Sequence, residues 1–248
     1  MVEFRQAESP DISATGLLKR PPNPLRYDGQ SEDPNEVAGI IRALTPENVR
    51  VLDVGCGTGS LTVIANRGKG NRVVGLEPDS GRSAVARTRG IETFCGYLDD
   101  EFIRANGQFD VIVFSDVLEH LASPNEMLKR AMDGLRPGGI ILASVPNVAH
   151  WSLRLKLLFG RFDYTDTGLC DATHLRWFTE QSIKGLFLAQ GLEILDVRHT
   201  VGYFLQVYRS GYFKVAPDRL LRKSIRTMTK LYPRLFACQF VIKARKPK

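Results

Sequence analysis

Residues 51–60 have the sequence VLDVGCGTGS, in which a short apolar run leads directly into glycines at positions 55, 57 and 59. A glycine-rich turn after a buried strand lets a ligand approach the backbone closely, and the helix that follows offers free N–H groups. We therefore predict a strand over 50–54, a ligand-binding turn, and a helix over 60–66. Several nucleotide-containing ligands fit such a turn, so the flanking sequence has to decide between them.

Strand and helix signals alternate around this turn. Residues 33–36, Asp-Pro-Asn-Glu, are typical of a helix start with Asp33 as N-cap, and predict a helix to about Leu44. The further predicted elements are strands over 72–76, 92–95, 109–114, 140–145, 192–197 and 236–244, helices over 80–89, 125–135 and 179–190, and a turn at 137–139. Such alternation predicts an α/β fold with a doubly wound, mostly parallel sheet and helices on both faces. Ligands of such sheets bind outside the carboxyl ends of the strands, near the point where strand order reverses.

Four segments organise the chain. Residues 1–30 contain four prolines and no sustained period, which predicts a loose N-terminal arm. Residues 31–248 are expected to form a single domain. Within it, 146–178 is rich in aromatic and polar residues and 203–234 is basic, so we interpret them as inserts after the fifth strand and before the last.

The composition is that of an ordinary globular protein, with 248 residues of which 43% are hydrophobic and 25% are charged. No apolar run approaches the ~20 residues that cross a bilayer, and the N-terminus lacks an apolar signal segment. The four cysteines, Cys56, Cys95, Cys170 and Cys238, are widely separated and form no CxxC pair. This pattern argues against a zinc site or a disulfide framework and favours a cytoplasmic location.

Basic residues are concentrated at the C-terminus. The chain carries +7 overall, with twelve Lys and Arg and one acid in residues 209–248, which leaves −4 for residues 1–208. Over 217–233, apolar residues such as Leu221 and Ile225 recur at helical spacing among basic ones. Such a helix could contact an anionic membrane surface, at the inner membrane face, or it could cover the sheet edge with its basic side chains in solvent. Because the body is mildly acidic and lacks an NPPY-like motif, nucleic acid is not expected as a partner.

An acid at the glycine-rich turn separates two kinds of ligand. Asp53 lies two residues before the first glycine, where a carboxylate repels a pyrophosphate but suits a cationic amino group and a sulfonium. The dinucleotide pattern GxGxxG also requires a glycine at position 60, where this chain has Ser60. Both observations count against NAD and favour S-adenosylmethionine.

Residues 51–62, VLDVGCGTGSLT, resemble motif I of the class I S-adenosylmethionine-dependent methyltransferases. The resemblance continues through VVGLEPD, GYLD, DVIVFSDVLEHL and LRPGGIILASVPN, although Tyr97 stands where the family often has Asp. It implies a Rossmann-like fold with a seven-stranded sheet, and S-adenosylmethionine as the cofactor. The cofactor-binding residues that it implies are Asp53, Gly55, Cys56, Gly57 and Gly59 at the methionine part, Glu77 and Pro78 at the ribose, Leu98 and Asp99 at the adenine, and Ser115 and His120 near the methyl donor.

Within the first insert, the strings GRFDYTDTG and THLRWFT resemble a subgroup of these enzymes associated with bacterial glycan and polysaccharide biosynthesis. The resemblance implies an acceptor pocket here, with Trp151, Phe162, Tyr164 and Trp177 as ring contacts and Asp163, Asp166, Asp171, His174 and Arg176 as hydroxyl contacts. A hydroxyl acceptor needs a base, and we take His174 as the first candidate and His150 as the second. In the alternative interpretation, Trp151, Leu155 and Leu158 are the apolar stripe of a helix and His174 orders a loop.

Asp116, Glu119 and His120 form an acid-x-x-acid-His string. On a helical turn their side chains would share one face and could hold a divalent ion, and some small-RNA methyltransferases use a related arrangement. Similar strings are nevertheless common in class I methyltransferases that need no metal. We therefore expect no metal, with His120 packing or bonding near the methyl donor.

These observations predict an S-adenosylmethionine-dependent methyltransferase that methylates a hydroxyl of a sugar or glycan, with a lipid-linked glycan as one option. Two alternatives remain open. The first is a methyltransferase acting on nitrogen or oxygen of an amino sugar, a phenol or another natural-product small molecule. The second is a catalytically silent, cofactor-binding regulator or scaffold, against which Asp53 and Glu77 count.

Overall fold

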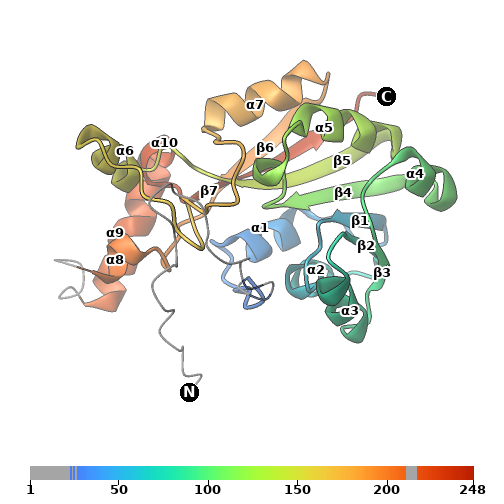
Figure 1. Cartoon of the computed structure of the whole chain (residues 1–248), viewed down its shortest axis with the longest axis horizontal. Coiled ribbons are helices and arrows are strands. Elements are labelled where there is room, and N and C mark those ends of the chain that lie inside the picture. Colours follow the sequence, from blue (N-terminus) through green and yellow to red (C-terminus); the bar gives the residue numbers. More distant parts are fainter. Residues whose placement is uncertain (1–22, 24, 26, 211–216) are drawn as a thin grey trace.

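Seven strands form one sheet in the order β3-β2-β1-β4-β5-β7-β6 (Figure 1). The structure, a computed structural model, describes residues 23, 25, 27–210 and 217–248. In chain order the strands are β1 (Arg50–Val54), β2 (Arg72–Glu77), β3 (Glu92–Cys95), β4 (Phe109–Ser115), β5 (Leu135–Pro146), β6 (Glu193–His199) and β7 (Gln239–Arg245). β7 runs antiparallel to both of its neighbours, and the strands from β3 to β5 are parallel. The predicted doubly wound, mostly parallel sheet is confirmed.

Helices cover both faces of this sheet (Figure 1). One face carries α4 (Asp100–Asn106), α5 (Pro124–Asp133) and α7 (Glu180–Ala189), and the other carries α1 (Val37–Leu44), α2 (Ser60–Asn66) and α3 (Ser80–Thr88). A short 3-10 helix, η1 (Leu118–His120), follows β4. Beyond the end toward which β4 points lie α6 (Trp151–Leu158), α8 (Gln206–Arg209), α9 (Asp218–Leu231) and α10 (Pro233–Phe236).

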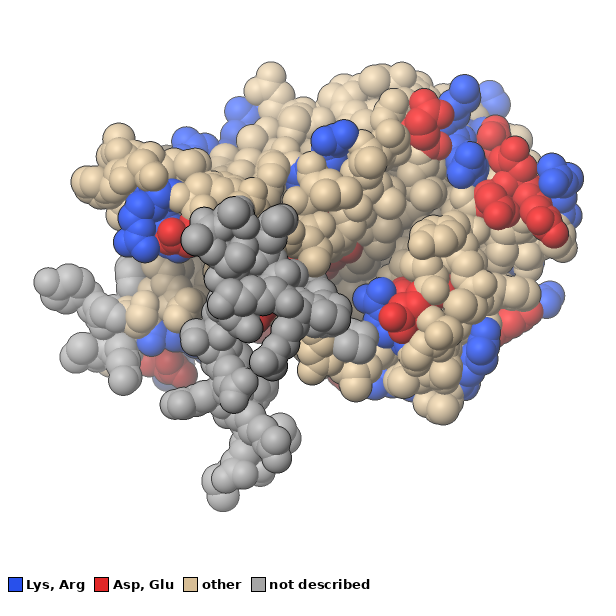
Figure 2. All heavy atoms as spheres, in the orientation of Figure 1, with Lys and Arg blue, Asp and Glu red and all other residues tan. Residues whose placement is uncertain are grey.

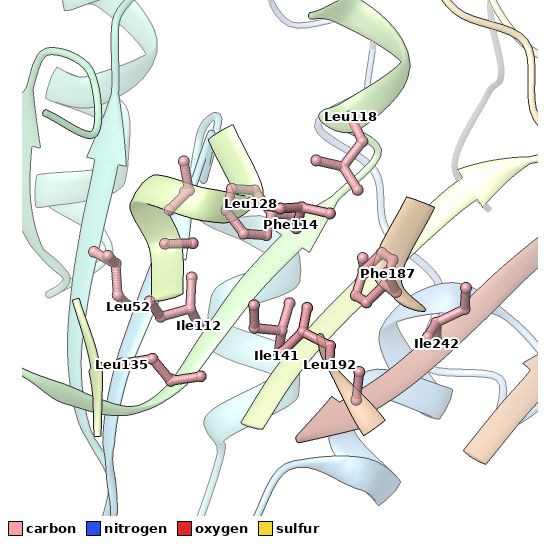
Figure 3. Close-up of a cluster of buried hydrophobic side chains, with 14 of the residues drawn as sticks. Leu52, Ile112, Phe114, Leu118, Leu128, Leu135, Ile141, Phe187, Leu192 and Ile242 are labelled. Atoms are coloured by element: carbon pink, nitrogen blue, oxygen red, sulfur yellow. The ribbon is translucent and has the colours of Figure 1, made fainter. Parts of the chain in front are cut away.

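The largest apolar core lies between the sheet and the helices α5 and α7 (Figure 3). Leu52, Ile112 and Ile141 come from β1, β4 and β5, whereas Leu128 and Phe187 come from the two helices. All five side chains are fully buried. Because burial contributes ~25 cal/mol per Å² of apolar surface removed from water, this layer holds neighbouring strands together with their carboxyl ends at one edge.

The predicted starts of the first helix and of the last strand are wrong. The first helix begins at Val37 and not directly after Asp33, because Asp33 Oδ1 accepts hydrogen bonds from Asn35 N (2.8 Å) and Asn35 Nδ2 (2.7 Å) and closes a separate turn. The last strand begins at Gln239 and not at 236, because Pro233 opens the short helix α10. In both places a proline-containing segment forms its own local structure before the longer element starts.

Two further segments differ from the prediction in kind. The helix α4 lies where no element is predicted; Asp99 caps it by accepting a hydrogen bond from Phe102 N (2.7 Å). The predicted turn at 137–139 lies inside β5, where Gly138 N donates to Lys246 O (3.1 Å) and Lys246 N to Gly139 O (2.9 Å). These bonds join residues far apart in the chain, so local patterns cannot show them.

The alternative in which α6 buries an apolar stripe is wrong in part. Leu155 and Leu158 are 48% and 77% exposed, and Leu153 is the buried side chain of this helix. Of the predicted N-terminal arm, residues 1–22, 24 and 26 lie outside the described residues, as do 211–216 of the predicted basic insert. Among the helices that are described, none combines the length and apolar character needed to cross a membrane.

Replacing Phe187 by alanine should destabilise the fold strongly. Phe187 is fully buried under the sheet, and removing a buried phenylalanine ring costs ~3–5 kcal/mol through lost burial and the cavity left behind. Urea unfolding followed by circular dichroism measures this change. The neighbouring substitution Leu188→Ala is the matched control, because Leu188 is 58% exposed and should change the free energy of unfolding little. Equal effects of the two substitutions would contradict the packing described here.

Candidate active site

The candidate site lies at the carboxyl edge of the sheet, where strand order reverses between β1 and β4. Asp53 of β1 pairs in register with Gly75 of β2 on one side and with Val113 of β4 on the other. The loop after β4 touches the loop after β1: a Cβ added to Gly55 would lie 2.6 Å from Val117 Cγ2. The segments after β1 and β4 therefore form two walls of one site, as expected for a doubly wound sheet.

The glycine-rich loop is bonded to the neighbouring strand. Gly55 N and Cys56 N donate to Leu76 O at 2.7 and 3.2 Å, which ties the loop to the end of β2. Gly57 has a φ of +57°, and a Cβ added there would meet no atom within 4 Å. The backbone at Gly57 therefore faces open space, which is the geometry that a close-fitting ligand requires. Cys56 is buried beside the loop, and burial raises the pKa of its thiol above the usual range.

Two buried carboxylates lie beneath this loop. Asp53 is 3% and Glu77 2% exposed. Asp53 Oδ2 accepts a hydrogen bond from Thr62 Oγ1 (2.6 Å), and burial, aided by the nearby Glu77 charge, raises the pKa of Asp53 to about 7. Glu77 Oε2 accepts from Gly57 N (2.9 Å), and Oε1 pairs with the Arg82 guanidinium at 2.9 Å. Both acids thus face the loop from below instead of facing solvent.

The other residues predicted to hold the cofactor follow neighbouring strands at the same edge. Leu98 is buried after β3, next to Asp99, whose side chain caps α4. Ser115 ends β4, and its Oγ lies 3.2 Å from Ser144 Oγ of β5. Pro78 follows β2, and its carbonyl oxygen lies 3.5 Å from Cys95 Sγ. The topology thus places the ends of β1 to β4, which carry these residues, along one edge.

Asp116 turns away from the two residues with which it was grouped by spacing. Its φ is +53°, its N donates to Ser144 Oγ (3.0 Å), and its Oδ1 accepts from Gln239 Nε2 of β7 (2.6 Å). Burial raises the pKa of Asp116 to about 6. Because the chain reverses here and continues as the short 3-10 helix η1, Asp116 does not share a helical face with Glu119 and His120.

Glu119, His120 and His174 come together instead. One ligand atom from each lies within 4.8 Å of the others, and the two imidazole rings are 4.8 Å apart. Glu119 O accepts hydrogen bonds from Leu175 N (2.8 Å) and Arg176 N (2.9 Å), which tie the segment after β4 to the insert. The Glu119 side chain is 1% exposed, and burial raises the pKa of its carboxyl group well above the usual range. We call these three residues the Glu-His-His cluster.

A row of rings extends from this cluster. The His174 ring lies 5.5 Å from Trp177, Trp177 lies 5.1 Å from Phe162, and Phe162 lies 5.5 Å from Tyr164, all in edge-on contact. Three of the four predicted aromatic contacts are therefore brought together. Trp151 lies in a different group, where its Nε1 donates to Tyr208 Oη (3.0 Å).

Comparison with known proteins identifies the fold and the cofactor. A family model for a methyltransferase domain matches residues 29–197. The chain belongs to the class I S-adenosylmethionine-dependent methyltransferases. This enzyme is 32% identical over 188 residues to a ubiquinone biosynthesis O-methyltransferase of Dinoroseobacter shibae, which covers 72% of this chain and 75% of the relative. It is also 31% identical over 137 residues to a trans-aconitate 2-methyltransferase of Deinococcus radiodurans. That match covers 54% of this chain and 53% of the relative. These names do not support the glycan subgroup that the insert resembles.

Solved structures agree on the fold. A Thermotoga maritima S-adenosylmethionine-dependent methyltransferase, a possible histamine N-methyltransferase, is similar with a TM-score of 0.56 and 16% identity over 84% of this chain and 87% of that one. A Burkholderia thailandensis 1,6-didemethyltoxoflavin-N1-methyltransferase with bound S-adenosylhomocysteine is similar with a TM-score of 0.53 and 19% sequence identity. The likeness covers 85% of this chain and 76% of that one. At such identities the likeness concerns the fold alone. The open backbone at Gly57 and the buried acids Asp53 and Glu77 fit the predicted cofactor.

His150 of the methyltransferase lies apart from the Glu-His-His cluster. It is fully buried, it caps α6, and its ring nitrogens lie 2.8 Å from Ser152 Oγ and 3.2 Å from Tyr208 Oη. Burial lowers the pKa of His150 to about 4, so it stays neutral near pH 7. Of the two candidate bases, the structure brings only His174 next to His120.

The polar residues predicted in the insert divide into a buried and an exposed set. Asp171 is fully buried, and its Oδ1 accepts from Thr173 N (2.9 Å) and Thr173 Oγ1 (2.7 Å). Asp163 pairs with Arg161 at 3.0 Å on the surface, and Asp166 is half-buried. Arg176 donates to Ala122 O across the two segments. Of these acids, only Asp171 is connected to the cluster.

The described end of the N-terminal arm spans both sides of the site. Asp28 pairs with Arg89 of the segment after α3 at 2.8 Å and accepts from Thr58 Oγ1 of the glycine-rich loop. Tyr27 Oη donates to Asp171 Oδ2 of the insert (2.6 Å). No local sequence pattern connects Tyr27, Asp28, Arg89 and Thr58, so the sequence alone does not predict a role for them.

Replacing Glu77 by glutamine should weaken cofactor binding. An amide keeps the shape of the side chain but loses one acceptor oxygen and the charge, and a hydrogen bond to a charged group contributes ~1.5–3 kcal/mol, so we expect affinity for S-adenosylhomocysteine to fall about tenfold or more. Isothermal titration calorimetry measures the dissociation constant. Glu92→Gln is the control, because Glu92 lies on β3 with half of its side chain exposed. Unchanged affinity in Glu77→Gln would exclude Glu77 from the cofactor site.

Proposed function

We propose that this chain transfers the methyl group of S-adenosylmethionine to a hydroxyl oxygen of a small-molecule acceptor. The observation that carries the proposal is the position of the Glu-His-His cluster, because two of its members, Glu119 and His120, come shortly after Val117, the residue beside Gly55 of the glycine-rich loop. Titratable groups in this position would lie beside the expected methyl donor, where deprotonation of a hydroxyl needs them. The similarity to a ubiquinone biosynthesis O-methyltransferase also supports oxygen as the acceptor atom.

Methyl transfer to a hydroxyl requires the protein to position the two reactants and to remove one proton from the acceptor. When bound, the cofactor supplies a methyl group on a sulfonium, which is a good leaving group. In the proposed step His174 takes the proton of the acceptor hydroxyl, the oxygen forms a bond to the methyl carbon, and the pair of electrons of the breaking carbon–sulfur bond stays on sulfur. The chain's main task is to align these three atoms and to exclude water.

Two acceptor classes fit the insert. We propose a sugar or glycan hydroxyl first, because the insert resembles enzymes of glycan biosynthesis and carries the polar residues Asp163 and Asp166 close to Phe162 and Tyr164 in the sequence. A phenol is the second candidate, which the row from Trp177 through Phe162 to Tyr164 favours, since ring edges pack well on a flat aromatic acceptor.

Labelled S-adenosylmethionine offered with a panel of sugars, glycans and phenols tests this function. We expect methylated glycans; labelling of phenols alone would select the second class. His174→Ala should lower turnover by ~10²-fold or more, because general-base catalysis contributes this much. Affinity for S-adenosylhomocysteine should hardly change in this variant.

The control for His174→Ala is His199→Ala, since His199 bonds Glu180 at 3.3 Å on another part of the chain. We expect His199→Ala to keep its turnover. A protein that binds the cofactor but labels no acceptor would support the catalytically silent alternative and overturn the proposal.

We also propose that the end of the molecule formed by α6 and α9 contacts an anionic membrane surface. Leu157, Leu158 and Phe159 at the end of α6 are 48%, 77% and 72% exposed, and α9 nearby exposes basic residues including Lys223 and Arg226. In Figure 2 the projecting α6 end is mainly uncharged, with Lys and Arg directly beneath it and a smaller acidic group beside them. An apolar projection beside basic side chains is complementary to acyl chains and anionic headgroups.

Co-sedimentation with phosphatidylglycerol-containing vesicles tests this contact. The double substitution Leu158→Ser and Phe159→Ser should lower vesicle binding about tenfold, because it removes apolar surface that would enter the bilayer. Leu188→Ser is the control, since Leu188 is also exposed but lies on α7. Vesicle binding that does not depend on α6, or no binding at low salt, would contradict the proposal.

A further inference from the structure

We propose that the Glu-His-His cluster, Glu119, His120 and His174, holds one divalent transition-metal ion. The sequence alone predicts no metal, because strings like that of Asp116, Glu119 and His120 are common in class I methyltransferases that need none. In the structure the third residue beside Glu119 and His120 is His174 of the insert, and not Asp116. One ligand atom of each of these three residues lies within 4.8 Å of the others. Ligand bonds of ~2.0–2.2 Å to one ion place such atoms about 3–3.5 Å apart, so small side-chain rotations close the site.

Glu119 is the strongest reason to place a cation here. Both of its carboxylate oxygens are buried, and among the described residues neither has a hydrogen-bond partner. No Lys or Arg of the described part pairs with it, and its charged neighbours include the acids Asp116 and Asp171. An isolated buried carboxylate is very costly, whereas a metal ion at its oxygens supplies the missing charge and the missing bonds.

His120 is already oriented as metal-binding histidines are. Its Nδ1 lies 3.2 Å from Thr173 O and 3.2 Å from Thr173 Oγ1. Donation to the carbonyl assigns the proton to Nδ1 and leaves the lone pair on Nε2. Thr173 Oγ1 in turn donates to Asp171 Oδ1 (2.7 Å). An imidazole whose second nitrogen is fixed by a carbonyl, with a carboxylate behind it, is the usual support of a metal ligand.

The backbone brings the ligands together independently of any ion. Glu119 O accepts from Leu175 N and Arg176 N, directly after His174, and His174 N donates to Asp171 O (3.0 Å). The donor set of two imidazoles and one carboxylate suits Zn²⁺, Mn²⁺ or Co²⁺ better than Mg²⁺ or Ca²⁺, which prefer oxygen ligands. Three protein ligands also leave a coordination position open.

This inference deepens the proposed function, on which its catalytic meaning rests. An acceptor hydroxyl in the open position would lose its proton more readily, because a bound cation stabilises the alkoxide or phenolate. His174 would then act as a ligand instead of as the base, and the proton would pass to solvent. The bond changes at the methyl carbon stay as described above.

Metal binding can be measured without acceptor or turnover. Protein treated with a chelator and dialysed is titrated with Zn²⁺ against a chromophoric chelator, with Mn²⁺ by electron paramagnetic resonance, and with Co²⁺ by visible absorption. We expect about one ion per chain, and a fall in affinity of ~10²-fold or more in Glu119→Gln and His174→Gln. Thr173→Val keeps the backbone carbonyl beside His120 Nδ1 but removes the hydroxyl that links His120 to Asp171, and affinity for the ion should fall ~10–100-fold. His199→Gln is the matched control and should bind like the unchanged protein.

Binding of S-adenosylhomocysteine by each variant verifies that it is folded. If none of the three ions binds the chelator-treated protein, or if binding is the same in Glu119→Gln and His174→Gln as in the unchanged chain, the metal site is overturned. That result would leave methyl transfer untouched. Conversely, a chain that binds one ion through these residues but methylates no acceptor would overturn the proposed function and keep the metal site.

Discussion

The fit of the β1 carboxyl end against β2 is the constraint on which the site depends. The loop after β1 lies directly on β2, because Gly55 N and Cys56 N both bond Leu76 O. This close approach requires a glycine in the facing strand: a Cβ added to Gly75 would lie 2.8 Å from Cys56 Sγ. The same contact puts the end of β2 under the loop, so that Glu77 and Gly57 meet. A shift of one strand by a residue would reverse every side chain along it and separate these groups.

Among the carboxylates buried at this edge, Asp53, Glu77 and Glu119 differ in the groups that bond them. Asp53 bonds the Thr62 hydroxyl, and Glu77 bonds the backbone of Gly57. Glu119 has no such bond from the described residues. Buried acids oppose folding unless something compensates for them, so their presence marks an edge arranged for cationic or hydrogen-bonding ligands. The sulfonium nucleoside beside the first two, and the metal ion that we propose at the third, would be compensations of this kind.

The insert after β5 joins the two halves of the site. Residues 171–176 bond to the segment after β4, and Tyr27 and Asp28 connect the insert with the glycine-rich loop. A substitution in the insert should therefore alter the binding of the methyl donor as well as the binding of the acceptor. The exposed end of α6 belongs to the same insert, so acceptor delivery from a surface and acceptor binding would share one element.

The sequence by itself determined the sheet and the cofactor loop. The strands β1 to β4 and the glycine-rich turn are each encoded within a few consecutive residues, through apolar period, helix caps and glycine spacing. Glu77 belongs to the same kind of information, since it ends a strand that the pattern already marks.

Tertiary structure alone decided the Glu-His-His cluster. The positive φ of Asp116 removes that residue from the face on which helical spacing puts it, while backbone bonds from the insert to Glu119 bring in His174. Tertiary packing also buries His150 completely, and it brings Asp28 into an ion pair with Arg89. Such groupings depend on contacts between residues far apart in the chain, and side-chain direction after an irregular turn cannot be extrapolated from a regular period.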